Sequence, residues 1–334
     1  MTLQWTRSPG KPVTTVIEGV SGVEEASAWV RAHHAELREV LTRHGAVHLR
    51  GLPIGTAGDF AAVRDALFAA RAKYQEKATP RSDFGDDVFS STDLPPAQAI
   101  RMHNENSYTL TFPGLLLFCC LTAPEEGGAT PVADVREVLA ELPPELVERF
   151  RTHGWALTRN YGEHISLDWR TAFATDSRAD VERYCTENRI GWEWGEDDTL
   201  RTRQVRPALI CHPLTGEQVW FNHVAFWSEW SLDPDIRDVL VGEFGEDGLP
   251  FNTALGDGTP LTAEEVAVLD AAYEKATVRE TWQPGDLLLV DNVLSAHGRD
   301  PFRGDRRIVV AMGEPVAVAD CSPAVPAGEA ALAV

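Results

Sequence analysis

The sequence predicts a mainly β protein of the α+β class, a single β-sandwich or barrel with helical insertions. Apolar, strand-like runs dominate the middle and the end of the chain, at 115–121, 285–291 and 307–312. Strands and helices do not alternate regularly along the chain, which disfavours a doubly wound parallel sheet. We find no internal repeat and no linker, and we therefore expect one domain over residues 1–334.

The N-terminal part of the sequence predicts two helices around a strand. Ser21 and Glu24 have the spacing of a capping box, and the helix that follows should end near Gly45. The apolar run 46–50 then predicts a strand, and a second helix is expected over about 57–73.

The rest of the chain divides into a loop, an insertion and a β-rich end. Residues 75–100 are broken by Pro, Ser and Gly, and a loop of this length is usually functional, so a lid is expected at about 75–100. A helical insertion is expected over about 135–275, with helices at 139–150, 233–243 and 262–275 and a short strand at 219–222. His297 is expected in a loop between the last two strands.

Charge and cysteine content exclude several classes of protein. The chain has 30 Lys and Arg against 51 Asp and Glu, a formal net charge of −21. Such an acidic chain should be repelled by phosphate backbones and anionic membranes, so we expect no nucleic acid and no membrane partner. Five Cys without a C-x-x-C pair indicate reduced thiols, and no leader or apolar span is visible, so a cytoplasmic protein is expected.

A potential metal site begins at His103 and Glu105. Residues two apart on an extended segment project from the same face, so both side chains can point into a barrel. His-x-Glu is a weak signal alone because it is common by chance. With His297 as a third ligand it would form the two-His-one-carboxylate set of non-haem Fe(II) oxygenases.

The final strand carries a candidate anion-binding residue. Strand alternation groups Arg307 with Val309 and Ala311 on one face, and places Arg306 on the other. An arginine that points into a β-barrel needs an anionic partner, and a dicarboxylic co-substrate would provide one.

These segments together resemble the TauD/TfdA superfamily of Fe(II)- and 2-oxoglutarate-dependent dioxygenases, and in particular its SyrP-like branch. The resemblance runs from about residue 30 to about residue 315. The segments that carry it are 103–108, 127–134, 201–207, 219–222 and 291–312.

The resemblance implies a double-stranded β-helix, or jelly roll, and a set of residue roles. His103, Glu105 and His297 would be the catalytic iron ligands. Thr130 and Arg307 would bind 2-oxoglutarate, with O2 as the second co-substrate. Halogenases of this superfamily replace the carboxylate ligand, so the presence of Glu105 argues against halogenation.

The SyrP-like branch implies hydroxylation of an unactivated C–H in an amino-acid-like small molecule, with release of succinate and CO2, in the biosynthesis of peptide natural products such as antibiotics. The substrate could be free or tethered to a carrier protein, for which a basic patch at Arg201, Arg203 and Arg206 would be a docking site. Candidate substrate contacts come from the matching segments. They are Ser107, Tyr108, Asn222 and His223.

Three alternatives stay open from the sequence. The same cofactors also support desaturation, cyclisation or epimerisation, which product mass would distinguish from hydroxylation. A cupin-type metal protein would show no dependence on 2-oxoglutarate. A non-catalytic binding module with the same fold would bind no iron.

Overall fold

A six-stranded sheet forms the centre of the protein. The structure is a computed structural model of the chain and describes residues 3–72, 76, 78, 81–162 and 167–328. The strand order is β1-β2-β15-β5-β18-β3, with β1 and β2 parallel and the other pairs antiparallel. The strands are β1 (Val13–Val16), β2 (Ala46–Arg50), β15 (Leu287–Asp291), β5 (Thr111–Thr122), β18 (Arg307–Ala317) and β3 (Phe89–Ser90).

A four-stranded sheet packs against one face of the six-stranded sheet. Its order is β14-β7-β16-β4, and Val132 of β7 belongs to the same apolar cluster as Phe118, Val290 and Val310 of the large sheet. The strands are β14 (Thr277–Val278), β7 (Val132–Asp134), β16 (Ser295–Arg299) and β4 (Ile100–His103).

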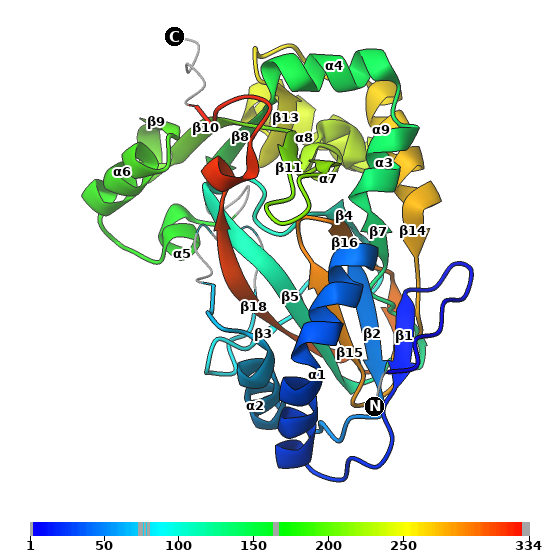
Figure 1. Ribbon diagram of the computed structural model, residues 1–334. Coiled ribbons are helices and arrows are strands. Elements are labelled where there is room, and N and C mark those ends of the chain that lie inside the picture. Colours follow the sequence, from blue (N-terminus) through cyan, green and yellow to red (C-terminus); the bar gives the residue numbers. More distant parts are fainter. Residues whose placement is uncertain (1–2, 73–75, 77, 79–80, 163–166, 329–334) are drawn as a thin grey trace.

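Two helices cover the opposite face of the six-stranded sheet. Figure 1 shows α1 (Val23–His44) and α2 (Ala57–Leu67) lying across β2, β15 and β5. Leu37, Leu41 and Phe60 of these helices pack with Leu117 and Leu289 of the sheet. The large sheet is therefore buried on both faces, which explains the continuous apolar run at 115–121.

The middle of the chain adds a third sheet and the remaining helices. The third sheet has the order β13-β8-β10-β9, and two short pairs, β11-β12 and β17-β6, complete the strands of the described chain. These strands are β13 (Phe251–Leu255), β8 (Trp155–Tyr161), β10 (Leu200–Arg206), β9 (Gly191–Trp194), β11 (Leu209–Cys211), β12 (Gln218–Trp220), β17 (Phe302–Arg303) and β6 (Glu126–Gly127). The helices are α3 (Val135–Glu141), α4 (Pro144–His153), α5 (Trp169–Phe173), α6 (Arg178–Glu187), α7 (Val224–Trp227), α8 (Pro234–Phe244) and α9 (Ala263–Ala276), with 3₁₀ turns at Glu196–Asp198, Glu229–Ser231, Glu246–Gly248 and Val318–Cys321.

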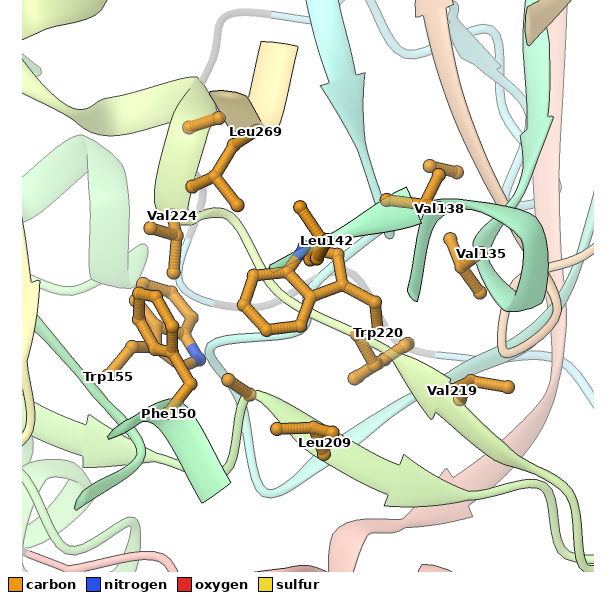
Figure 2. Packing of buried hydrophobic residues seen from close by; sticks show 14 of the residues in the cluster. Val135, Val138, Leu142, Phe150, Trp155, Leu209, Val219, Trp220, Val224 and Leu269 are labelled. Atoms are coloured by element: carbon orange, nitrogen blue, oxygen red, sulfur yellow. The ribbon is translucent and has the colours of Figure 1, made fainter. Parts of the chain in front are cut away.

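A large apolar cluster joins these helices to the four-stranded sheet. Figure 2 shows Trp220 with Leu142, Leu209 and Val219 around it, and Phe150 beside Trp155. The rings of Phe150 and Trp220 meet edge to face, with centroids 5.0 Å apart. This cluster fixes α7, which follows Trp220 closely in the chain and borders the site described below.

Several sequence expectations need correction. Helix α1 begins at Val23 with Gly22 as N-cap, and Ser21 donates from both its N–H and its hydroxyl to Glu25 rather than forming a box with Glu24. Helix α2 ends at Leu67, well before the expected 73, which lies outside the described residues. The expected helix at 139–150 is two helices, because Leu142 and Pro143 are extended before Pro144.

Three further expectations also differ from the structure: the helical insertion, the loop that contains His297 and the lid. Residues 135–275 contain helices but also the whole third sheet, whose strands β8 and β10 alternate buried and half-buried positions. His297 lies within strand β16 rather than in a loop. The expected lid falls partly outside the described residues, and its described part includes β3 and the first turn-rich stretch before β4.

The five cysteines are all free thiols, as expected. Among the described residues, the helices are too short or too polar to cross a membrane.

Candidate metal centre and co-substrate pocket

The two candidate histidine ligands lie opposite each other on neighbouring strands. His103 is the last residue of β4, His297 is in the middle of β16, and the antiparallel register pairs these two residues directly. Their ring centroids are 4.4 Å apart. The four-stranded sheet thus brings together two side chains that are distant in sequence.

Glu105 joins them from the turn that follows β4, where Asn292 holds its main chain. The N–H of Glu105 donates to Oδ1 of Asn292 at 2.7 Å, and Nδ2 of Asn292 donates to the Glu105 carbonyl at 2.9 Å and to the Pro113 carbonyl at 2.7 Å. The side chain of Asn292 therefore fixes the main chain that carries the Glu105 carboxylate.

The three donor atoms form a compact, buried group. Nε2 of His297 lies 3.5 Å from Oε2 of Glu105, and Nε2 of His103 lies 4.0 Å from the same oxygen. One donor atom from each residue lies within 4.8 Å of the other two, and no other such group of three occurs among the described residues. Two imidazoles and a carboxylate are the donor set of non-haem Fe(II) sites.

The environment of His103 prepares its Nε2 for a metal. Nδ1 of His103 lies 2.8 Å from the Arg101 carbonyl, so Nδ1 carries the proton and the lone pair of Nε2 faces Glu105. Burial, and then the neighbouring His297, lower the pKa of His103 to about 3, although Glu105 opposes this shift. A neutral imidazole is the form that a metal ligand requires, so these residues fit an iron ion.

Arg81 meets the carboxylate of Glu105 inside the site. Its Nη2 donates to the two carboxylate oxygens at 3.1 and 3.0 Å, and both side chains are buried. Burial alone would raise the pKa of Glu105, but the positive charge of Arg81 and then His297 lower it well below its usual range. Glu105 is therefore ionised, as a ligand must be. No pattern in the sequence singles out Arg81, because it lies in the irregular stretch between α2 and β3.

A pocket beside the donor set is lined by Thr130 and Arg306. It also borders His103, His297 and Phe118. The guanidinium of Arg306 donates to the Thr130 hydroxyl at 3.2 Å, to the Ser91 hydroxyl at 3.1 Å and to the Gly128 carbonyl at 2.9 Å. Burial, and then the charge of Arg299, lower the pKa of Arg306 to about 10, which leaves it cationic at neutral pH.

Arg307, the arginine that the sequence analysis favoured, points away from this pocket. Its side chain is exposed and lies over the ring of Phe84, 4.9 Å from the centroid. Alternation along β18 holds as expected, but the inward face is that of Ile308 and Val310, and Arg306 is in phase with it. The prediction that Arg307 points inward was wrong because α1 and α2 bury the outer face of the sheet as well. Both faces of β18 are therefore apolar in sequence, and the sequence does not distinguish them.

Arg299 is buried and organises the segment before β4. It donates to four backbone carbonyls, of Thr92 at 3.4 Å, Leu94 at 3.1 Å, Pro95 at 2.8 Å and Gln98 at 2.7 Å. Because Arg299 is two residues after His297 on β16, this network ties one wall of the pocket to the strand that carries a candidate ligand.

The four predicted substrate contacts divide into two groups. Ser107 and His223 lie close to the donor set, since Ser107 Oγ is 2.6 Å from Nδ1 of His223, whose ring centroid is 4.9 Å from that of His103. Burial, and then His103, lower the pKa of His223 well below its ordinary value. Tyr108 packs on Trp227 and donates to the Glu76 carbonyl at 3.1 Å, at the edge of this group.

Asn222 has a different position from the one expected. Its Oδ1 accepts the N–H of Val224 at 3.0 Å and its amide reaches the Ala208 carbonyl at 3.4 Å, so its side chain holds the start of α7. The predicted basic docking patch is also incomplete, because Arg206 is fully buried and donates to the Tyr108 carbonyl at 2.7 Å. Arg206 is three residues after Arg203 on β10, so strand alternation puts it on the buried face with Thr202 and Gln204, opposite to Arg201 and Arg203.

Comparison with known proteins decides the family. Residues 10–312 match the family described as taurine catabolism dioxygenase TauD, TfdA family. The chain belongs to the TauD/TfdA dioxygenase family. It is therefore a 2-oxoglutarate-dependent dioxygenase, and its cofactor and co-substrates are Fe(II), 2-oxoglutarate and O2.

Two curated proteins resemble this TauD/TfdA dioxygenase over most of its length. The dapdiamide synthesis protein DdaC of Enterobacter agglomerans is 37% identical over 283 residues, which cover 85% of this chain and 86% of DdaC. A clavaminate synthase-like protein of Arabidopsis thaliana is 31% identical over 288 residues, or 83% of each chain.

Solved structures support the fold of this TauD/TfdA dioxygenase. PvcB of Pseudomonas aeruginosa has a TM-score of 0.53 at 15% identity, covering 98% of this chain and 95% of PvcB. An asparagine oxygenase has a TM-score of 0.53 at 18% identity, covering 87% of this chain and 83% of the oxygenase.

Proposed function

We propose that this dioxygenase hydroxylates an unactivated C–H of an amino acid or an amino-acid-derived molecule in natural-product biosynthesis. The observation that carries the proposal is the convergence of His103, Glu105 and His297 beside a pocket lined by Arg306 and Thr130. The relationship to DdaC, a dapdiamide synthesis protein, supports a biosynthetic role, and the fold shared with an asparagine oxygenase supports an amino-acid-like substrate.

The proposed metal ligands are His103, Glu105 and His297. The six-stranded and four-stranded sheets, packed face to face with the ligands between them, support a jelly-roll core in a single domain over 1–334. Fe(II), with 2-oxoglutarate and O2, would supply the oxidising power for C–H cleavage: one oxygen atom would enter the product and the other would enter succinate as 2-oxoglutarate loses CO2.

The protein's own residues would bind and orient the reactants. Arg306 would pair with the distal carboxylate of 2-oxoglutarate, and Thr130 would donate its hydroxyl proton to the same group. Thr130 is well placed for this because its oxygen already accepts hydrogen bonds from Arg306 and from Nε1 of Trp282 at 3.3 Å, which leaves its proton to point elsewhere. His103 would stay in one tautomer through the Arg101 carbonyl.

An aromatic wall beside His103 would exclude water from the reacting centre. The rings of His223 and Phe226 lie 4.9 and 4.7 Å from that of His103, and Trp227 stacks on His223 at 4.3 Å. A dry site strengthens the charge interactions that hold the co-substrate and prevents side reactions. His223 and Ser107 would face the substrate on this side.

The test measures succinate and product mass together. Anaerobically purified protein is mixed with Fe(II), 2-oxoglutarate and a panel of amino acids, and air is then admitted. Succinate that rises with one amino acid, and a product heavier by one oxygen, would establish the hydroxylase. A product that has lost two hydrogens instead would establish desaturation or cyclisation.

Two variants make the result specific for the proposed site. His103→Ala should abolish succinate formation, whereas His34→Ala, an exposed histidine on α1, should leave it unchanged. Succinate formation that survives in the His103→Ala variant would contradict the proposed ligand set.

A further inference from the structure

Trp282 contacts one wall of the co-substrate pocket from behind. Its indole Nε1 donates a hydrogen bond to the Thr130 hydroxyl oxygen at 3.3 Å. Of this pair, Thr130 borders the pocket and Trp282 does not. Trp282 is also buried, in the loop between β14 and β15. Any effect of Trp282 on a molecule in the pocket must therefore pass through Thr130.

The hydroxyl of Thr130 has both of its acceptor positions occupied. A hydroxyl group carries one proton and two lone pairs. Nη2 of Arg306 donates to Thr130 Oγ1 at 3.2 Å, and Nε1 of Trp282 donates to the same atom at 3.3 Å. The O–H bond must then point away from both donors. With either donor missing, the hydroxyl could rotate into other positions.

The loop that carries Trp282 is fixed on both sides of this residue. Nη2 of Arg50 donates to the Thr281 carbonyl at 2.8 Å, and the Gln283 N–H donates to Oδ2 of Asp286 at 2.8 Å. Arg50 and Asp286 also form an ion pair, with Nη2 and Oδ2 2.8 Å apart, and Asp286 is buried. This ion pair holds the main chain before and after Trp282, and its charge-assisted hydrogen bonds are of the strong kind.

Packing confines the indole ring itself. Trp282 belongs to the apolar cluster between the two main sheets, together with Cys120, Val132 and Ile308. The ring of His48 lies 5.7 Å from the indole, measured between centroids. Side chains in such a close-packed interior stay in one rotamer on average. The indole N–H is therefore a donor whose position is set before any ligand binds.

We propose that Trp282 is a positioning residue for 2-oxoglutarate, because it directs the O–H of Thr130 towards the distal carboxylate of this co-substrate. The inference rests on the proposed role of Thr130. Arg306 alone would leave one lone pair of the hydroxyl free, so that the group could turn about its C–O bond. With both donors present, turning the hydroxyl breaks a buried hydrogen bond, which is unfavourable.

The inference concerns selectivity among 2-oxo acids. 2-Oxoglutarate differs from shorter 2-oxo acids such as pyruvate in its distal carboxylate, the group that Thr130 and Arg306 are proposed to bind. A hydroxyl that already points in the right direction loses little rotational freedom when this carboxylate binds, which favours binding. Trp282 would thus strengthen binding of 2-oxoglutarate and leave ligands without a distal carboxylate unaffected.

The test measures binding to the full chain loaded with Mn(II) in the absence of air. Titration calorimetry gives the affinity for 2-oxoglutarate and for oxalate, a metal chelator that has no distal carboxylate. Trp282→Phe removes the N–H donor and keeps an aromatic ring. This variant should bind 2-oxoglutarate roughly two- to tenfold more weakly, the usual contribution of a neutral hydrogen bond, and oxalate as the unmodified protein does.

Trp169→Phe is the matched control. Trp169 is also buried, and its Nε1 also donates a hydrogen bond, to the Asp198 carbonyl at 3.0 Å. It belongs to a different apolar cluster, with Tyr161 and Val181. The control loses the same atoms from a similar environment and should bind both ligands as the unmodified protein does.

A double-mutant cycle shows whether Trp282 acts through Thr130. Thr130→Val removes the hydroxyl and should weaken binding of 2-oxoglutarate. Adding Trp282→Phe to Thr130→Val should cause little further loss, because the indole then has no hydroxyl to direct. Losses that simply add in the double variant would overturn the inference.

The indole N–H signal gives a readout that needs neither metal nor co-substrate. In isotope-labelled protein, the NMR signal that disappears in Trp282→Phe should move in Thr130→Val, since the indole loses its acceptor there. If Trp282→Phe does not fold, the indole signals of the ten tryptophans still decide. None of them moving in Thr130→Val would contradict the inference.

Two binding results would also overturn the inference. One is a Trp282→Phe variant that binds 2-oxoglutarate as well as Trp169→Phe does. The other is an equal loss of affinity for 2-oxoglutarate and oxalate, which would make the effect of Trp282 a general disturbance of the site. Unmodified Mn(II)-loaded protein that binds neither ligand would instead contradict the proposed function.

Discussion

The side chain of Asn292 forms a hydrogen bond on each side of the Glu105 residue. Its Oδ1 accepts from the Glu105 N–H at 2.7 Å, and its Nδ2 donates to the Glu105 carbonyl at 2.9 Å. Both residues are buried, and they come from the turn between β15 and β16 and the turn after β4. This one side chain therefore links the two segments that carry the candidate ligands.

Replacing Asn292 by Ala should weaken metal binding roughly 10- to 100-fold, the usual effect of losing a residue that orients a ligand. The buried N–H of Glu105 would also lose its partner, and the free energy of unfolding should fall by about 1–3 kcal/mol. Titration calorimetry with Mn(II) and urea unfolding measure the two effects. Asn188→Ala, at the half-buried end of α6, is the control; metal affinity equal in both variants would contradict the role of Asn292.

Arg306 and Arg307 should differ sharply in their effect on 2-oxoglutarate. Removing one partner of a buried charge pair costs about 2–5 kcal/mol, so Arg306→Gln should weaken 2-oxoglutarate binding roughly 30-fold or more. Arg307→Gln should bind as the unmodified protein does, since its side chain is exposed against Phe84. Calorimetry with Mn(II)-loaded protein decides between them, and the reverse ranking would restore the original choice of Arg307.

Arg299→Gln should loosen the segment 92–98. The four carbonyls that Arg299 now satisfies would lose their donor, which should make local opening easier by about 1–3 kcal/mol. Limited proteolysis should then cut this segment roughly five- to a hundred-fold faster, because cleavage follows the open population. Arg303→Gln serves as the exposed control, and equal cleavage rates in the two variants would argue that other contacts hold the segment.

His48 should make the fold sensitive to acid. Burial lowers the pKa of His48 to about 4, despite the opposing charge of Asp286, whereas an unfolded histidine titrates near 6.5. Between pH 6.5 and pH 4 the unfolded chain binds a proton at His48 that the folded protein does not bind. The free energy of unfolding therefore decreases as pH falls from about 6.5 towards 4. At pH 5 the loss should be on the order of 2 kcal/mol.

Urea unfolding at pH 7.5 and pH 5 tests this dependence on His48. The difference in unfolding free energy between the two pH values should shrink by that amount in His48→Gln and stay the same in His34→Gln, a variant of an exposed residue. An unchanged difference in His48→Gln would assign the acid sensitivity to other groups.

Motif spacing in the sequence was sufficient to find the three residues that the structure brings together as one buried set of potential metal ligands. His103, Glu105 and His297 converge, and Thr130 lies in the neighbouring pocket; all four positions fall within the segments 103–108, 127–134 and 291–312 that carry the family resemblance. The long buried strand around 115–121 and the helices near 233–243 and 262–275 were also confirmed, since an apolar run and a clear helical period are local properties.

What the sequence could not provide is the direction in which a residue points when both faces of a strand are apolar. Arg306 was placed outside and Arg307 inside for this reason. The sequence did not single out Arg81 or Arg299, because their partners, a carboxylate and four carbonyls, come from segments that meet only in the folded chain. Asn222 lies in a segment that carries the family resemblance, but its side chain holds the start of α7. Only its hydrogen bonds reveal this role.

The order of strands in the two main sheets has a consequence for how the chain folds during synthesis. β15 separates β2 from β5, and β16 lies between β7 and β4, so strands from the last part of the chain sit inside both sheets. When the ribosome has made everything up to α9, the six-stranded sheet still lacks β15 and β18, the four-stranded sheet lacks β14 and β16, and His103 has no partner on β16. The two sheets of the nascent chain therefore stay incomplete and exposed until the final segments emerge. Binding by chaperones would matter most in that interval.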